Sequence, residues 1–229
     1  MPTRGFLNWL DGLGWLVLSG GEADVSSPIR AKALARAASG GALYISLAAD
    51  EGEALQEDLE DLGAPAGFVL DLKEEPDVLL KQMSEVTLIV VEGGDSLDEV
   101  YEALSGAPLE GLRTAYEEGT VILLEGMAVN LLGKWAMTDE GSVLDGIEWV
   151  TNAFLEPGVG NIGDSPALQA ILSEQDQAVG VAIGLGSALA LGGGGDLEAW
   201  GEEEVVVALG RGYQTQLSQE ADLDEDDDE

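Results

Sequence analysis

The sequence predicts an α/β fold built around a mostly parallel sheet. Three observations support this prediction. Short, continuous apolar runs, which are typical of strands buried on both faces, recur along the chain. Helical patterns lie between these runs through the first 135 residues, and such alternation favours βαβ units. After residue 178 the runs follow one another with only turns between them, which predicts an antiparallel ribbon at the edge of the sheet.

The predicted strands are apolar runs bounded by glycine or polar residues. They occupy residues 14–20, 41–49, 66–72, 86–94, 120–126, 178–184, 187–193 and 204–210. The glycines at 192–195, which lie between the last two runs, are interpreted as a turn because no helix starts closely after them.

Helices are predicted where leucines and alanines recur at helical spacing. These segments are residues 27–39, 51–63, 96–106 and 166–175. The first has Ser27 as a cap and Pro28 at the first helical position, where a missing N–H group costs nothing.

The composition excludes several kinds of chemistry. The chain has no cysteine and no histidine, which removes disulfides, thiolate catalysis, the usual general base and the commonest metal ligand. The formal net charge is -36, with only nine lysines and arginines. These basic residues are scattered, whereas nucleic-acid binding depends on clustered ones, so we expect no nucleic-acid partner.

Length and charge distribution predict one folded domain over residues 1–213 and a disordered acidic tail over 214–229. The tail either binds a basic partner or acts as a solubilising end. The apolar run "GLGWLVLSGG" is too short and too rich in glycine to span a membrane, and no signal peptide is evident. We therefore expect a cytoplasmic protein without a membrane partner.

Carboxylates follow the predicted parallel strands, at the sheet edge where ligands of such folds bind. They are Glu22, Asp24, Asp50, Glu51, Glu92, Asp95 and Glu125. An acid-lined cleft for a cationic ligand or a hard divalent ion is one interpretation. The other is ordinary helix capping in a very acidic chain, since acidic residues favour loops and helix starts.

Several segments resemble the serine peptidase family that contains cyanophycinase and alpha-aspartyl dipeptidase, within the class I glutamine amidotransferase-like fold. The segments are "GWLVLSGGEAD", "YISLAADE", "LIVVEGGDSLDEVYEAL", "GTVILLEGMAVNLLG" and "GIEWVTNAFLEP", and the similarity runs over about residues 14–210. The resemblance implies a flavodoxin-like three-layer sandwich. It also implies a site near the turn at residues 125–128, which we call the elbow.

The residues that the resemblance assigns to catalysis are replaced. Met127 stands where the family has its nucleophilic serine, and Gly158 stands where it has its histidine. Gly184 and Leu185 replace an acidic pair in the late strands, and only the turn Gly93–Gly94–Asp95 is retained. Ser96 and Ser187 remain as alternative nucleophiles, but neither has a histidine to activate it.

These replacements predict a non-catalytic homologue that binds a peptide-like or cationic ligand, or a protein partner. The candidate ligand-binding residues are Gly93, Gly94, Asp95, Glu125, Gly126 and Glu156. The alternative is a divergent hydrolase in which Asp95, Glu125 and Glu156 act as carboxylate catalysts or hold a metal ion. We expect no cofactor. A homodimer is also considered, and an exposed patch of Trp9, Trp149 or Trp200 would favour it.

Overall fold

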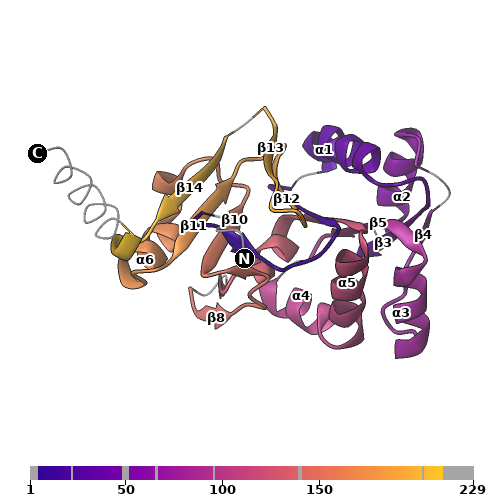
Figure 1. The fold of residues 1–229 in the computed structure, drawn as a ribbon, viewed down its shortest axis with the longest axis horizontal. Helices are drawn as coiled ribbons and strands as arrows, with labels where there is room; N and C mark the ends of the chain where they lie inside the picture. The colour runs from indigo at the N-terminus through magenta and orange to yellow at the C-terminus, as the bar shows by residue number, and fades with distance from the viewer. Residues whose placement is uncertain are drawn as a thin grey trace, which may run out of the picture.

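The fold is organised around a seven-stranded sheet with the order β13-β12-β2-β6-β5-β3-β4 (Figure 1). The computed structural model describes residues 5–21, 23–47, 52–64, 67–94, 96–138, 141–202 and 204–213. The strands of this sheet are β2 (Trp15–Ser19), β3 (Gly41–Ser46), β4 (Gly67–Val69), β5 (Val86–Glu92), β6 (Val121–Glu125), β12 (Ser187–Gly192) and β13 (Leu197–Gly201). The strands from β2 to β4 in this order are parallel, whereas β12 and β13 are antiparallel to their neighbours.

Both faces of this sheet are buried under helices, which explains the continuous apolar runs. Helices α1 (Ala23–Arg36) and α2 (Gly52–Asp61) cover one face, and α3 (Pro76–Ser84), α4 (Leu97–Leu104) and α5 (Ala107–Glu118) lie on the other (Figure 1). Side chains alternate between the two: Val121 and Leu123 pack with α1 and α2, whereas Ile122 and Leu124 pack in the opposite core. This period of two also fixes which way the last residue of each strand points.

A second, five-stranded sheet lies beside the first, with the order β14-β11-β10-β7-β8. Its strands are β7 (Trp135–Met137), β8 (Val143–Asp145), β10 (Ala153–Pro157), β11 (Val179–Ile183) and β14 (Val205–Leu209). Helix α6 (Pro166–Glu174) packs on it through Leu168 and Ile171. The remaining elements are the strand pair β1 (Asn8–Trp9) with β9 (Val150–Thr151) and the short 3-10 helices η1 (Gly126–Leu132) and η2 (Ile162–Asp164).

The predicted α/β class, the mostly parallel central sheet and the antiparallel C-terminal strands are confirmed. The C-terminal strands, however, are divided between two sheets instead of forming one ribbon. Strand β11 pairs with β14 in the second sheet, while β12 pairs with β2 in the first. The chain crosses between the sheets at residues 184–186, where Gly186 has a φ of 69° that favours glycine. Strand β13 lies in a segment that was predicted to be a turn.

The first helix begins earlier than predicted. Helix α1 starts at Ala23, so Pro28 lies inside it and not at its first position. A proline removes the hydrogen bond to the carbonyl four residues before it, here that of residue 24, next to the helix start. The helix therefore loses one backbone hydrogen bond near its N-terminus, where several N–H groups have no partner within the helix in any case. Helices α3 and α5 were not predicted.

The described helices include none long and apolar enough to cross a membrane. The predicted tail at 214–229 lies outside the described residues.

We expect the stability of the protein to rise with salt. The chain carries 45 acidic residues against nine basic ones, so its carboxylates repel one another. Raising NaCl from 0.1 to 1 M shortens the Debye length from about 10 to about 3 Å. The melting temperature measured by circular dichroism should increase by several degrees over this range. A melting temperature that falls, or does not change, would show that repulsion between carboxylates is not a main term in stability.

Candidate functional site

The carboxyl ends of β2, β6 and β5 meet at one edge of the central sheet. Ser19 pairs with Glu125, and Leu124 pairs with Val91, so the three strands end at the same level. The residues that follow them are Gly20 and Gly21 after β2, Gly126 after β6, and Gly93 and Gly94 after β5. In parallel sheets this edge is where ligands bind.

The elbow joins β6 to η1 in the predicted order of strand, turn and helix, although the helix is of the 3-10 type. Gly126, with a φ of 59°, carries the left-handed backbone of the turn, and a Cβ built on it would meet no atom within 4 Å. Met127 is half-buried and packs against the core. A side chain at position 126 would therefore project into open space, but Gly126 has no side chain.

A buried arginine of α1 binds the carboxylates at this edge of the sheet from the side of the core. Arg30 of α1 is only 2% exposed. It donates to Glu125 Oε2 through Nε at 3.0 Å and Nη2 at 2.6 Å, to Glu92 Oε1 through Nη2 at 2.6 Å, and to Asp58 Oδ2 through Nη1 at 2.9 Å. We call these four residues the Arg30 cluster. It links α1, α2, β5 and β6 through one guanidinium group.

Strand alternation explains this arrangement. Glu125 has the same parity as Val121 and Leu123, so it points toward α1 and α2. Glu92 shares the parity of Val90 and points the same way. The acid-lined cleft requires carboxylates that face a ligand. Glu92 and Glu125 do not meet this requirement, because both are bound to Arg30.

The electrostatics of the cluster are unbalanced, since one cation faces three carboxylates. Burial would lower the pKa of Arg30, but the hydrogen bond and charge of Glu125 and the charge of Glu92 outweigh it, so the pKa is raised. Burial raises the pKa of Glu125, and the charges of Glu92 and Asp58 add to this against the hydrogen bond from Arg30. Glu125 Oε1 is buried and has no hydrogen-bond partner within the described ranges.

The second replaced position, Gly158, lies close to the same edge. It has a φ of 81°, and a Cβ built on it would lie 3.6 Å from the carbonyl oxygen of Gly20. A Cβ built on Gly21 would in turn lie 3.3 Å from the backbone of Gly126. Gly158 and the elbow are therefore placed around the same short stretch of backbone at the end of β2.

Glu156 is the last residue but one of β10, two residues before Gly158. The side chain is half-buried, and burial raises its pKa while a hydrogen bond with Ser165 lowers it. Its Oε2 atom has no hydrogen-bond partner in the described part of the chain.

A cavity of about 610 Å³ opens at this edge. We call it the glycine cavity, and it is lined by Gly158, Gly160, Gly184, Leu185, Gly186, Gly201, Pro28 and Glu202. Most of its wall is backbone, and Glu202 is the only charged side chain among these residues. Glycine lets a ligand approach the backbone closely, so the cavity is suited to a ligand that is recognised through peptide groups.

The other predicted site residues are only partly brought together. Gly93 and Gly94 both have positive φ after β5, at 88° and 101°, while Asp95 lies outside the described residues. Glu22, Asp50 and Glu51 are also outside them, and the side chain of Asp24 is not described. Among the residues described, no group of three acidic side chains could hold a metal ion.

The tryptophans considered for a dimer surface are not exposed. Trp9, Trp149 and Trp200 are 6%, 6% and 2% exposed. They belong to the cores, because their large apolar rings pack under the sheets.

The fold is similar to that of solved peptidase structures. A peptidase from an acI-B1 actinobacterium matches with a TM-score of 0.69 at 16% identity, over 86% of this chain and 91% of that one. A candidate peptidase E protein from Listeria monocytogenes EGD-e matches with a TM-score of 0.61 at 16% identity, over 84% of this chain and 100% of that one. This chain has the fold of the peptidase E-like peptidases. No protein-family model and no curated protein matches its sequence.

The peptidase E-like fold is thus the part of the predicted resemblance that is confirmed. The role of Arg30 was not predicted, because in the sequence it is only one of the scattered basic residues. A signal was present, because Arg30 is flanked by Ile29 and lies three residues before Ala33, both on the buried face of α1. A charge on such a face requires a buried partner.

Replacing Arg30 with alanine should destabilise the protein by about 3–5 kcal/mol, because buried carboxylates would lose their partner. Urea denaturation followed by circular dichroism measures this change. Arg113→Ala is the matched control, since Arg113 is exposed and pairs with Glu117 on the surface of α5. It should cost no more than about 0.5 kcal/mol. Equal effects of the two variants would contradict the structural role of the cluster.

Glu125→Gln should stabilise the protein relative to wild type increasingly as pH rises from 4.5 to 7.5. The pKa of Glu125 is raised in the folded state, mainly by burial. The folded state therefore binds a proton that the unfolded state has released, and this contribution to stability is lost as pH rises through the folded pKa. Denaturation midpoints of both proteins at several pH values test this expectation, with Glu117→Gln as an exposed control. A difference that shrinks with pH would mean that Arg30 lowers the pKa of Glu125 instead.

Proposed function

We propose that this chain is a non-catalytic relative of the peptidase E-like peptidases, and that it binds a peptide-like, cationic ligand in the glycine cavity. The observation that carries the proposal is the elbow. It has the strand, turn and helix of a nucleophile turn, but it presents Gly126 and Met127 in a chain without histidine.

The chemistry of acyl transfer requires groups that this edge lacks. A thioether has no proton to lose, and glycine has no side chain, so neither residue of the turn can attack a carbonyl carbon. No histidine exists anywhere in the chain to act as a base. Loss of one triad member typically lowers turnover by about 10⁴- to 10⁶-fold, and here both positions are replaced.

Binding does not need those groups. The glycine cavity offers backbone N–H and C=O groups, which can pair with the peptide groups of a ligand. Glu202 at its wall and the net charge of -36 both favour a cationic ligand over an anionic one. A peptide with a basic side chain meets both conditions.

One observation favours the alternative, a hydrolase that uses carboxylates. Glu156 lies near Gly158 with a raised pKa and one oxygen atom without a hydrogen-bond partner in the described residues, as a general acid would need. Glu125 is less suited to act with it, because Arg30 already binds its other oxygen.

The proposal predicts that the purified protein binds β-aspartyl-arginine but does not hydrolyse it. Aspartyl-leucine should bind more weakly because it lacks the cationic side chain, and a fluorophosphonate should not label the protein. Gly126→Ser and Met127→Ser should remain inactive, because a serine at either position still lacks a base. Isothermal titration calorimetry and chromatography of the dipeptides measure binding and cleavage separately.

Variants of the cavity distinguish the outcomes. Gly160→Trp should fill the glycine cavity and abolish binding, whereas Gly194→Trp, in the exposed turn after β12, should leave it unchanged. Turnover by the wild-type protein would overturn the proposal. If that turnover were lost in Glu156→Gln, it would support the carboxylate hydrolase.

A further inference from the structure

Four strands form the edges of the two larger sheets: β4 and β13 in the seven-stranded sheet, and β8 and β14 in the five-stranded one (Figure 1). Unpaired edges favour association, and proteins commonly protect them by short length or by charged side chains. Three of these edges have such protection, because β4 and β8 have three residues each and β13 contains Glu198. Strand β14 differs, since its five residues, "VVVAL", include no charge and no proline.

The outer edge of β14 presents a row of backbone groups. The Glu204 carbonyl and the Gly210 N–H group pair with the residues that flank β11, at 3.2 and 2.8 Å. Backbone groups alternate in direction along an antiparallel strand, so those of the even-numbered residues point to β11. The backbone groups of Val205, Val207 and Leu209 therefore point away from β11, and no segment of the described chain pairs with them.

The side chains of these three residues are apolar and lie on one face of the sheet. Val207 is 45% exposed, whereas Val205 and Leu209 are half-buried and pack against the larger core. A further strand added at this edge would cover Val207 and pair the outward backbone groups. Strand addition at an exposed sheet edge is a common mode of recognition between chains.

The sequence of β14 is complementary to a second copy of itself in the antiparallel orientation. The register that pairs all the outward backbone groups sets Val207 opposite Val207 of the partner copy, and Val205 opposite Leu209. The same register sets Gly210 opposite Glu204. Arg211, the next residue, then lies beside the acidic residues that precede the partner's strand. Apolar residues thus meet apolar ones, and a basic residue meets acidic ones at both ends.

We propose that two copies of this chain associate through antiparallel pairing of β14 with β14, which joins their five-stranded sheets into one continuous sheet. The interface is independent of ligand binding in the glycine cavity. The net charge of -36 on each copy opposes the approach of the two, so salt should strengthen the dimer. In about 0.3 M NaCl the Debye length lies between about 3 and 10 Å, which screens distant charges more than those in contact.

Sedimentation equilibrium in this salt should show a monomer and a dimer in exchange at about 10 to 100 μM protein, because a single strand pair is a small interface. Val207→Pro removes an N–H group that faces the partner and none that faces β11. Val207→Lys sets two like charges opposite each other. Each variant should weaken the dimer by at least about tenfold. Leu197→Lys is the matched control, since Leu197 is 50% exposed on the other long edge, β13, and it should change the dissociation constant by less than about twofold.

The register has a separate test, because the chain contains no cysteine. Residues in a hydrogen-bonded antiparallel pair have Cα atoms about 5.5 Å apart, a separation that a disulfide can span. Val207→Cys should therefore form a disulfide-linked dimer under mild oxidation with diamide, seen by non-reducing electrophoresis. Val205→Cys and Leu197→Cys should form it at least about tenfold more slowly, because neither residue faces its own copy in this register.

The proposal is overturned if the wild-type protein remains a monomer throughout this concentration range. It is also overturned if both Val207 variants, with circular dichroism spectra like that of the wild type, dimerise as the wild type does. Cross-linking of Leu197→Cys as fast as that of Val207→Cys would likewise contradict it, because the contact would then not be specific to β14.

Discussion

The buried guanidinium group of Arg30 is the interaction on which the candidate site depends. The chain has five times as many acidic as basic residues, and two of its carboxylates end adjacent parallel strands. Left unpaired, Glu92 and Glu125 would repel each other in a low-dielectric layer and separate β5 from β6. Arg30 binds both and adds Asp58 from α2, so two helices and two strands share one cation. Desolvation of these charges is costly, so such a cluster secures a specific arrangement more than it adds stability.

The orientation of these carboxylates determines what remains at the sheet edge. Because Glu125 points into the layer between the sheet and α1, the elbow presents only the backbone of Gly126 toward open space. Gly158 and Gly184 contribute no side chain either. The edge that would hold side-chain chemistry in an enzyme is thus lined largely by peptide groups. The proposed loss of hydrolysis therefore rests on the lining of this edge and not on a change of fold.

The parts of this structure that were predictable from sequence are those set by local pattern. The run at 120–126 identifies β6 because a strand buried on both faces must be apolar throughout. Helix α3 was missed because its short apolar stripe directly follows the acidic residues 74 and 75 and resembles a loop. The division of the C-terminal strands between two sheets depends on which strand each of them pairs with in the folded protein. Residues 184–186, which connect β11 to β12, do not specify these partners. Glu125 and Arg30 are 95 residues apart, so their pairing arises only when α1 is laid over β6.

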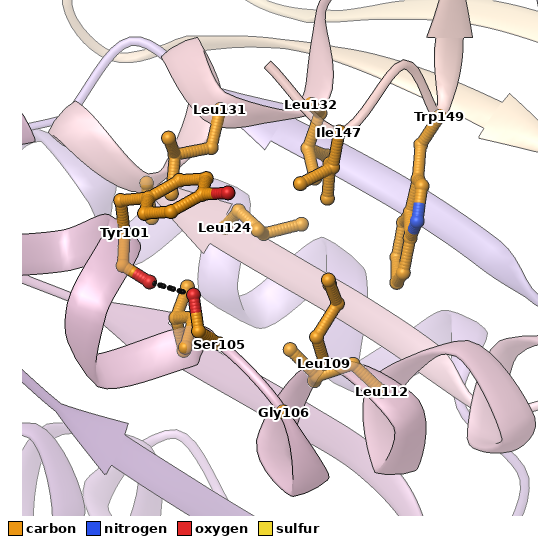
Figure 2. Close-up of a pocket in the computed structure, with 12 residues that line it drawn as sticks. Tyr101, Ser105, Gly106, Leu109, Leu112, Leu124, Leu131, Leu132, Ile147 and Trp149 are labelled. Carbon is orange, nitrogen blue, oxygen red and sulfur yellow. Dashed lines mark hydrogen bonds between the residues drawn. The ribbon is translucent and has the colours of Figure 1, made fainter. Parts of the chain in front are cut away.

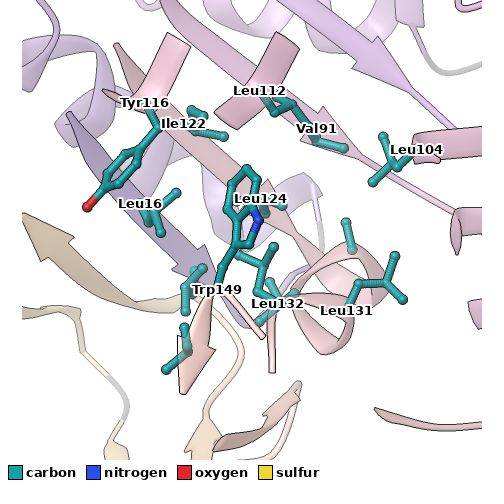
Figure 3. Close-up of a cluster of buried hydrophobic side chains, with 14 of the residues drawn as sticks. Leu16, Val91, Leu104, Leu112, Tyr116, Ile122, Leu124, Leu131, Leu132 and Trp149 are labelled. Carbon is teal, nitrogen blue, oxygen red and sulfur yellow. The ribbon is translucent and has the colours of Figure 1, made fainter. Parts of the chain in front are cut away.

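The alternation of side chains along a strand nevertheless determines more of the candidate site than the composition of the chain indicates. In β6, the residues at odd positions face α1 and α2, while Leu124 lines a pocket between α4, α5 and η1 (Figure 2) and faces the opposite core (Figure 3). Strand β6 therefore supplies Glu125 to the Arg30 cluster and its neighbour Leu124 to a pocket that no charged side chain lines. A shift of register by one residue would exchange them, placing a carboxylate against Trp149 and a leucine against Arg30. The first change would bury an unpaired carboxylate, and the second would remove one of the carboxylates that bind Arg30. The Arg30 cluster therefore fixes the register of β6, and with it the shape of the sheet edge beside the elbow.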